Sequence, residues 1–210
     1  MPKKKLIIFP YNGNGIEALD CILDQEFEFI GFIDDSIEKS NAKQTWPVFN
    51  REILSKYPEA FVLAVPGSPL SFLKRSEHIQ SLNLSVNRFI SIVHPSAKLG
   101  RNISIGMNCL ILAGVVLTSN AQVGNHVCIL PNTVIHHDAI IGDYTLIGSN
   151  VAVAGGATIG RNCYIGSGTN IMNGIHIGSN TLVGLGSNVV SGVPENSRIA
   201  GNPAKPIKSK

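Results

Sequence analysis

The sequence has few charged and few aromatic residues. Of its 210 residues, 15% are Asp, Glu, Lys or Arg and 6% are Phe, Trp or Tyr, whereas glycine occurs 21 times. Such a composition is typical of a glycine-rich β architecture and argues against both a helical bundle and a disordered chain. A chain of this length has room for one or two domains with a substantial core.

Long apolar runs are also missing. No segment approaches the roughly 18 consecutive apolar residues of a membrane-spanning helix, and the start of the sequence has no secretory hydrophobic region. Cysteine is scarce, and Cys21, Cys109, Cys128 and Cys163 form no Cys-x-x-Cys pair. Free thiols are typical of a reducing compartment. We therefore expect a cytoplasmic protein without a membrane partner.

Basic charge is not spread over the chain, although the formal net charge is +3. Six lysines lie at the two ends of the sequence, namely Lys3, Lys4, Lys5, Lys205, Lys208 and Lys210. Without them the chain has 11 basic and 14 acidic residues. Because nucleic-acid-binding proteins carry basic charge on a folded face, we expect no nucleic-acid partner.

The centre of the sequence carries a repeat of six residues. At every sixth position from residue 93 to residue 189 the side chain is Val, Leu or Ile, without a change of register. A small or β-branched residue stands four places after each of these positions as far as residue 169, and glycine often follows them directly. Self-similarity at a short fixed period predicts a β-solenoid, here with two inward-facing residues per repeat.

This repeat is similar to the hexapeptide signature of the left-handed β-helix acyltransferases. The resemblance implies a triangular prism in which three repeats make one coil, with about five coils over residues 89–193. The left-handed path is likewise implied by the resemblance, because parallel crossovers are otherwise right-handed. Residues 194–210 form a C-terminal tail.

Residues 1–88 have the pattern of an α/β domain. Apolar runs at residues 5–9, 27–33 and 60–65 predict three buried strands. A glycine turn separates the first strand from an amphipathic segment with Ile16, Leu19, Ile22 and Leu23 at helical spacing, and a helical stretch follows the third strand to about Leu82. We expect a Rossmann-like half domain, too short for a complete dinucleotide-binding fold.

Polar and glycine residues follow each of these predicted strands. The carboxyl ends of parallel strands meet at one crevice, where ligands of open α/β sheets bind. Asp34 and Asp35 lie about 20 residues after the glycine turn, the spacing of a ribose- or base-binding carboxylate. A tight turn that binds nothing remains an alternative for the glycine segment. The predicted nucleotide-sugar residues are Asn12, Gly13, Asn14, Asp34, Asp35, Pro66 and Gly67.

The spacing of the histidines does not suit a metal site, so we expect no metal. The segment His136-His137-Asp138 is more informative. Ile135 and Ala139 are the inward residues of this repeat, so the three polar side chains should point outward at a corner. A histidine beside a carboxylate in such a place is suited to take a proton, although a merely solvated histidine is the alternative.

The whole chain resembles the PglD/NeuD-like group of bacterial sugar acyltransferases, most closely over residues 132–143. The resemblance implies that His137 is the catalytic base, with Asp138 as its partner, and that the Gly155 N–H contacts the acetyl carbonyl. His136 stands where relatives often have glutamate, and Leu146 where some have histidine. The tail resembles the Gly-x-Pro-Ala-Lys motif that lines the coenzyme A site. The implied acetyl-CoA residues are Gly155, Gly156, Gly201, Pro203, Ala204 and Lys205.

The expected activity is therefore acetyl transfer from acetyl-CoA to the amino group of a 4-amino-4,6-dideoxy sugar linked to UDP, dTDP or GDP, for a surface glycan such as an O-antigen. O-acetylation of a sialic-acid-type sugar and a non-catalytic nucleotide-sugar-binding scaffold are the alternatives. The resemblance also implies a homotrimer. Four apolar residues that share one outward column of the repeat would supply its interface: Val134, Ile140, Leu146 and Leu182.

Overall fold

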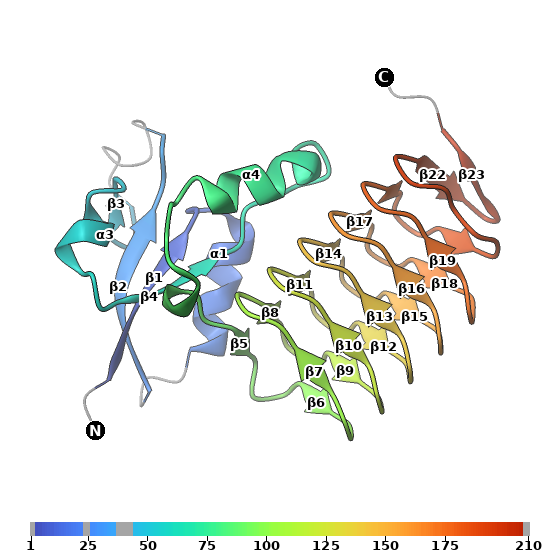
Figure 1. The fold of residues 1–210 in the computed structure, drawn as a ribbon, viewed down its shortest axis with the longest axis horizontal. Coiled ribbons are helices and arrows are strands. Elements are labelled where there is room, and N and C mark those ends of the chain that lie inside the picture. The colour runs from blue at the N-terminus through green and yellow to red at the C-terminus, as the bar shows by residue number, and fades with distance from the viewer. Residues whose placement is uncertain (1–2, 23–25, 37–43, 208–210) are drawn as a thin grey trace.

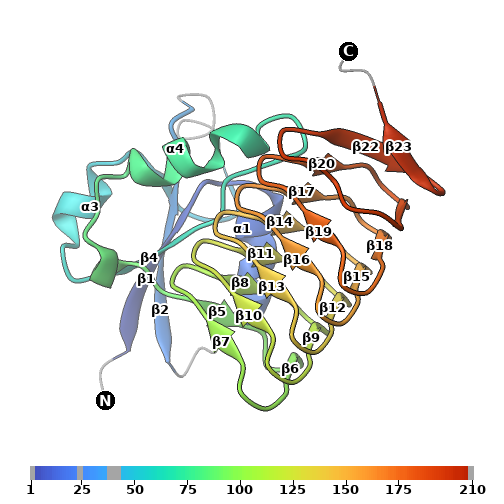
Figure 2. The ribbon, with the colours of Figure 1, turned by 45° about the vertical axis from the view of Figure 1, so that its right-hand side comes forward.

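The computed structural model describes residues 3–22, 26–36 and 44–207. Figure 1 shows a small α/β unit beside a long stack of short strands, and Figure 2 shows the stack turned toward the viewer. Within the described residues, no helix combines the length and the apolarity needed to cross a membrane.

The α/β unit contains a four-stranded parallel sheet with the order β3-β2-β1-β4. Its strands are β1 Lys4–Phe9, β2 Phe27–Ile33, β3 Val48–Phe49 and β4 Phe61–Ala64. The helices and 3-10 turns are α1 Gly13–Glu17, η1 Ala18–Cys21, α3 Ile53–Lys56, η2 Phe72–Lys74, α4 Arg75–Gln80 and η3 Val86–Arg88. The three predicted strands are present. β3 and α3 had no clear periodic signal, because both are very short.

The expected first helix is shorter than its pattern suggested. Asn12 caps α1 by accepting a hydrogen bond from the Gly15 backbone N–H, 2.8 Å away. After Glu17 the chain tightens into η1, which ends at Cys21. Leu23, the last residue of the predicted apolar face, lies outside the described residues.

The solenoid has three faces, and each face is a sheet of short strands. Each face is named by the number of strands that it contains. The six-stranded face contains β6 Lys98–Leu99, β9 Val116–Leu117, β12 Val134–Ile135, β15 Ala152–Val153, β18 Asn170–Ile171 and β21 Asn188–Val189. The five-stranded face contains β7 Ser104–Ile105, β10 Gln122–Val123, β13 Ile140–Ile141, β16 Thr158–Ile159 and β19 His176–Ile177.

The third face is eight-stranded and carries the tail hairpin. It contains β5 Ile92–Val93, β8 Leu110–Ile111, β11 Cys128–Ile129, β14 Leu146–Ile147, β17 Tyr164–Ile165, β20 Leu182–Val183, β22 Arg198–Gly201 and β23 Ala204–Pro206. β23 pairs antiparallel with β22, whereas the other strands of this face pair in parallel. Each strand lies eighteen residues from its neighbour up to β20, as three repeats per coil require.

The repeat works as predicted in the solenoid interior. From β8 to β21, the second residue of each strand points inward into one continuous core. The residue four places later is also buried, as the fully buried pair Ile135 and Ala139 shows. At the corners the chain passes through positive φ, mostly at asparagine, for example Asn120 at 62° and Asn132 at 60°. Asparagine tolerates this left-handed backbone better than most residues.

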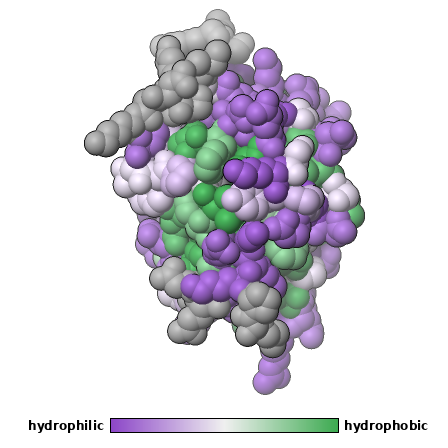
Figure 3. All heavy atoms as spheres, turned by 90° about the vertical axis from the view of Figure 1, so that its left-hand side faces the viewer, coloured by the Kyte–Doolittle hydropathy of each residue, from purple (hydrophilic) through white to green (hydrophobic). Residues whose placement is uncertain are grey.

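The α/β unit is docked on the eight-stranded face. The outward residues of that face, among them Ile92, Leu110, Cys128 and Leu146, share one buried cluster with Leu6 and other residues of the α/β unit. Figure 3 shows the molecule from the side of the α/β unit, where hydrophobic side chains lie among polar ones. A shared apolar core of this kind fixes the two units relative to each other.

The docking corrects the predicted trimer surface. Val134, Ile140 and Leu146 occupy the same place in the repeat, but successive repeats lie on different faces of the prism. Leu146 is only 3% exposed because the α/β unit of its own chain covers it, and Leu182 belongs to the same face. Ile140, in contrast, is 42% exposed on the five-stranded face. In a three-sided solenoid, residues at the same position of the repeat lie on the same face only if they are three repeats apart.

Candidate active site

His137 lies at the corner between the six-stranded and five-stranded faces. β12 ends at Ile135 and β13 begins at Ile140, so residues 136–138 form the turn between two inward side chains. All three residues of the turn are exposed, as the register of the repeat predicts. This place is called the His137 corner below, and it includes the equivalent turns of the neighbouring coils.

Asp138 fixes the orientation of the His137 ring. Nδ1 of His137 lies 2.8 Å from Oδ2 of Asp138, and Nδ2 of Asn120, one coil below, donates to Oδ1 of Asp138 at 2.8 Å. The hydrogen bonds from His137 and Asn120 lower the pKa of Asp138. An ionised carboxylate only accepts hydrogen bonds, so Nδ1 carries the hydrogen, and the lone pair of the neutral ring is on Nε2. Within the part of the chain that the structure describes, His136 has no such side-chain partner.

Gly155, one coil above, lies directly against Nε2 of His137. A Cβ atom on Gly155 would stand 2.5 Å from Nε2 of His137. The next residue, Gly156, donates its backbone N–H to the carbonyl of His137 at 2.9 Å. Gly155 is buried, and its N–H finds no acceptor in residues 3–22, 26–36 and 44–207. A buried donor without an acceptor, beside an imidazole lone pair, is suited to receive a developing oxyanion.

A cavity of about 430 Å³ lies at the carboxyl ends of β1, β2 and β4. It is lined by Phe9, Pro10, Asn12, Asp34, Asp35, Pro66, Gly67, Ser68, Ser71 and His78. Five of the seven predicted nucleotide-sugar residues line it, whereas Gly13 and Asn14 belong to α1 and do not. Ser68, Ser71 and His78 were not predicted. Their exposure to the cavity depends on how α4 docks, which has no signal in the sequence.

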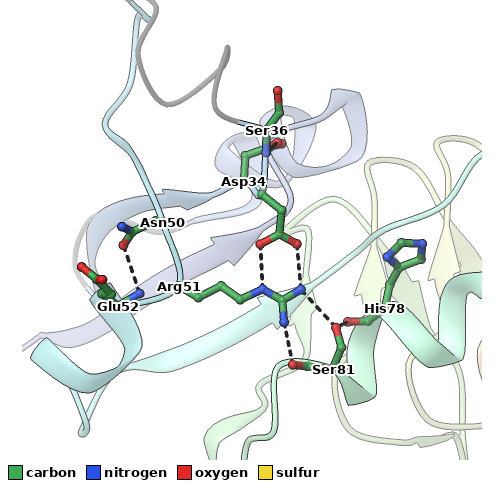
Figure 4. Close-up of polar contacts among 8 residues, drawn as sticks. Asp34, Ser36, Asn50, Arg51, Glu52, His78 and Ser81 are labelled. Atoms are coloured by element: carbon green, nitrogen blue, oxygen red, sulfur yellow. Dashed lines mark hydrogen bonds and ion pairs between the residues drawn. The ribbon is translucent and has the colours of Figure 1, made fainter.

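The two adjacent aspartates differ in their contacts. Both carboxylate oxygens of Asp35 accept hydrogen bonds from Arg51, each at 2.7 Å, and Arg51 also donates to the Ser81 carbonyl at 2.6 Å. Figure 4 shows this guanidinium held between the carboxylate and Ser81, with His78 nearby. The bond from Arg51 lowers the pKa of Asp35. Asp34 is buried and accepts from the Ser36 N–H at 2.9 Å.

A second cavity, of about 270 Å³, lies where the tail meets the last coil. Ala204 and Lys205 line it together with Val189, which ends β21, and with residues 190–194, which follow this strand. Gly201 ends β22 and Pro203 lies in the turn to β23, and neither of them lines the cavity. β21 is separated from β12 by three strand spacings, or about 14 Å. The cavity therefore lies on the His137 corner, further along the solenoid axis.

The two halves of the predicted site are separated within one chain. The α/β unit covers the eight-stranded face, whereas the His137 corner joins the other two faces. All the lining residues of the 430 Å³ cavity come from the α/β unit. Searching the described residues also reveals no group of three or more His, Cys, Asp or Glu arranged to hold a metal ion.

Two family profiles match the solenoid. The family described as "Bacterial transferase hexapeptide (six repeats)" matches residues 120–155, and "Hexapeptide repeat of succinyl-transferase" matches residues 99–119 and 139–173. A search of curated proteins by sequence gives no match. The matched profiles confirm the hexapeptide repeats that the resemblance implied.

Several solved structures share the fold over nearly the whole chain. The acetyltransferase domain of PglB from Neisseria gonorrhoeae FA1090, in complex with acetyl coenzyme A, has a TM-score of 0.84 at 21% identity and covers 98% of this chain and 100% of its own. PerB from Caulobacter crescentus, with CoA and GDP-perosamine, has a TM-score of 0.81 at 21% identity, covering 99% of each chain. WeeI from Acinetobacter baumannii AYE has a TM-score of 0.80 at 21% identity, covering 98% of this chain and 100% of its own.

Proposed function

We propose that this chain is an acetyl-CoA-dependent N-acetyltransferase that acts on the amino group of a nucleotide-linked 4-amino-4,6-dideoxy sugar. The observation that carries the proposal is the His137 corner. There Asp138 holds Nδ1 of the imidazole, and Nε2 faces a buried glycine whose N–H has no acceptor within the described chain. This arrangement provides a base and an oxyanion donor side by side.

The reaction removes two protons from the sugar nitrogen and displaces the CoA thiolate from the acetyl group. The sugar ammonium loses a proton to Nε2 of His137, and the neutral amine then attacks the thioester carbonyl, forming the C–N bond. The ionised Asp138 stabilises the imidazolium. The Gly155 N–H stabilises the tetrahedral oxyanion, as a donor worth about 3 kcal/mol in other oxyanion holes. Collapse of that intermediate breaks the C–S bond. The leaving CoA thiolate takes up the second proton that the attacking nitrogen has to lose, so CoA departs as the thiol, and His137 returns its own proton to the solvent.

Acetyl-CoA would lie along the His137 corner. Its acetyl group would rest at Gly155 and Gly156, and its distal part would reach the cavity lined by Ala204 and Lys205. The separation of about 14 Å, taken from three strand spacings, suits the extended pantetheine arm of the cofactor. Gly201 and Pro203 would shape the hairpin that closes this end of the site.

The nucleotide sugar would occupy the 430 Å³ cavity of the Rossmann-like unit. The strand order β3-β2-β1-β4 is the order in which a nucleotide-binding half domain starts, and the cavity lies at the carboxyl ends of its strands. Asp34 and Asp35, which both line the cavity, would accept hydrogen bonds from a base. The solved relatives support this substrate class, because one of them holds GDP-perosamine and another acetyl coenzyme A.

A homotrimer of left-handed β-helices would unite the two halves. The cavity and the His137 corner lie on different sides of one chain, so a neighbouring copy has to present its nucleotide sugar to His137. Three large apolar side chains near the His137 corner are exposed: Ile140 at 42%, Met172 at 48% and Val190 at 49%. Exposed apolar groups around a site are typical of a surface that another subunit covers.

The direct test is to measure turnover of acetyl-CoA with a panel of UDP-, dTDP- and GDP-linked 4-amino sugars. The release of free CoA thiol reports the rate. Replacing His137 by Ala should reduce kcat by about 10²–10⁴, the usual contribution of a general base. His136→Ala is the matched control and should change kcat by less than tenfold, because His136 lacks the carboxylate partner. Unchanged turnover of His137→Ala would refute the assignment, and turnover only with hydroxyl acceptors would point to O-acetylation.

A further inference from the structure

The most unusual charged residue of the molecule is Arg75, at the start of α4. Its side chain is 0% exposed, and a guanidinium does not lose its proton in proteins. Nη1 donates to the Pro66 carbonyl, and Nη2 donates to the His126 carbonyl at 2.8 Å. No carboxylate pairs with it among the described residues, and its Nε has no hydrogen-bond partner there. A buried cation is normally paired, because burying charge is costly.

Arg75 lies directly beneath one edge of the nucleotide cavity. Pro66 and Gly67 both line that cavity. A Cβ atom on Gly67 would stand 3.4 Å from Nη1 of Arg75, and Gly67 itself has no side chain to intervene. An anionic group that lies on Gly67 from the cavity side would therefore be attracted by the charge of the guanidinium, with only one layer of backbone between them.

The cavity wall itself is poor in positive charge. Among the residues that the structure describes, its lining includes the carboxylates of Asp34 and Asp35 but no lysine or arginine, and His78 is the one other titratable side chain. Arg51, which contacts Asp35 in the cavity wall, already donates to Asp35 and Ser81. A nucleotide-linked sugar brings a diphosphate with about two negative charges, which needs a cationic counterpart.

We propose that Arg75 holds the diphosphate of the nucleotide sugar at the Pro66–Gly67 edge of the cavity by its buried charge. This inference rests on the proposed function. Arg75 is a positioning residue, because it acts through the backbone of Pro66 and Gly67 and does not touch the reacting atoms. Its unpaired charge is effective at this range because a low-dielectric interior screens it weakly. A neutral donor could bridge the same two carbonyls, so the charge is what arginine adds.

The test separates the charge of Arg75 from its hydrogen bonds. Cys128 is buried beside Arg75: burial raises the pKa of its thiol to about 12, and the guanidinium acts against this. Cys128→Asp would supply the missing counter-ion while Arg75 and its two carbonyl contacts stay, and Cys128→Ser is the neutral control. Calorimetry would measure the affinities of UDP, dTDP and GDP and of the corresponding uncharged nucleosides.

We expect Cys128→Asp to weaken binding of the preferred diphosphate at least tenfold while nucleoside affinity changes less than twofold. Arg75→Lys should keep the preference for the diphosphate, and Arg75→Gln should lose it. The proposal would be overturned if Arg75→Gln weakened the affinities for diphosphate and nucleoside equally and Cys128→Asp had no effect. Arg75 would then have a structural role only.

A measurement on the unmodified protein covers the case in which these variants do not fold. Inorganic pyrophosphate should compete with the bound nucleoside diphosphate, and failure to compete at millimolar concentration would overturn the inference. If the protein binds neither nucleoside diphosphates nor nucleosides, the proposed function fails instead. The two failures are therefore distinguishable.

Discussion

At the scale of single residues, the His137 corner depends on a glycine that leaves room for an imidazole. Any side chain at Gly155 would overlap His137, because even a Cβ atom would stand 2.5 Å from Nε2. The glycine at this position serves the adjacent ring and not a special backbone angle, since Gly155 is not among the residues with positive φ. The same glycine presents the free N–H.

Replacing Gly155 by Ala should therefore reduce kcat about 100-fold, because the methyl group displaces the imidazole and the oxyanion donor together. The solenoid should remain folded, since only the corner is disturbed. Gly186→Asn is the matched control: its φ is +62° and a Cβ atom there meets open space, so activity should stay within twofold. Normal kcat in Gly155→Ala, measured by CoA release, would show that His137 does not work from this position.

His126 is the residue that should make the fold sensitive to mild acid. Its ring is buried, stacks on Tyr144 with centroids 4.6 Å apart, and lies near Arg75. Burial, aided by the charge of Arg75, lowers the pKa of His126 to about 4. In the unfolded chain the imidazole of His126 binds a proton near pH 6.5. Between about pH 6.5 and pH 4, this imidazole is therefore protonated in the unfolded state and neutral in the folded state.

Stability should consequently fall as the pH drops through this window, by about 1–2 kcal/mol for a ring that keeps some contact with solvent. His126→Asn removes the titration and keeps a residue that tolerates the positive φ of 59° found here. Urea unfolding at pH 7.5, 6, 5 and 4 should show a flatter profile for His126→Asn than for the unmodified chain. Parallel profiles would exclude His126 as the source of acid sensitivity.

At the scale of elements, one corner of the solenoid docks the α/β unit through polar contacts. Asn108 follows β7, and its side chain acts like a neighbouring strand: it accepts from the Ala64 N–H at 2.7 Å and donates to the Ala64 carbonyl at 2.8 Å. Asn108 is 0% exposed and also contacts Nδ1 of His126 at 2.9 Å. Both backbone groups of Ala64, at the end of β4, thus depend on a side chain 44 residues away.

Asn108→Gly should destabilise the protein by about 2–4 kcal/mol, because it leaves two buried backbone groups without partners. Glycine is chosen because it keeps the left-handed corner unstrained. Asn102→Gly is the control, since Asn102 has the same φ of 55° but is exposed, and it should cost less than 1 kcal/mol. If urea unfolding showed equal losses of stability for the two variants, the backbone conformation, and not the contact with Ala64, would account for both losses.

The comparison of sequence and structure is instructive at this scale. The period of six predicted the solenoid strands from β5 to β21, because inward side chains are selected at a fixed spacing. β22 and β23 lie beyond the repeat, in the segment expected to be a tail. It also placed His136, His137 and Asp138 on the outside. The repeat could not tell which of three equivalent faces the α/β unit covers, and so Leu146 was assigned to a trimer surface although it is buried inside its own chain. Arg75, Asn108 and His78 had no signal, because their roles arise from contacts between segments far apart in sequence.

At the scale of the whole molecule, the proposed site is divided between a cavity on the α/β unit and the His137 corner. Both parts are rigidly connected through a shared apolar core, so a hinge within one chain is a poor way to unite them. Two or more copies can do so if each presents its cavity to the His137 corner of the next. This heterologous contact closes into a ring when the rotation is three-fold.

Complementation between inactive variants tests this arrangement. His137→Ala keeps an intact cavity, whereas Ser71→Trp fills the cavity with an indole and keeps an intact His137 corner. Each variant alone should be inactive. When the two are co-expressed in equal amounts and assemble at random, about a quarter of the contacts unite an intact cavity with an intact His137, so about a quarter of the activity should return.

The outcome depends on geometry alone, because neither variant chain holds both intact parts. If the cavity and His137 of the same chain worked together, every chain of the mixture would lack one part, and the mixture would be as inactive as its components. Mixing the two variants without exchange of subunits is the control and should restore nothing. Sedimentation of the co-expressed protein should then give three times the mass of one chain, and a monomer with full activity would refute both the shared site and the trimer.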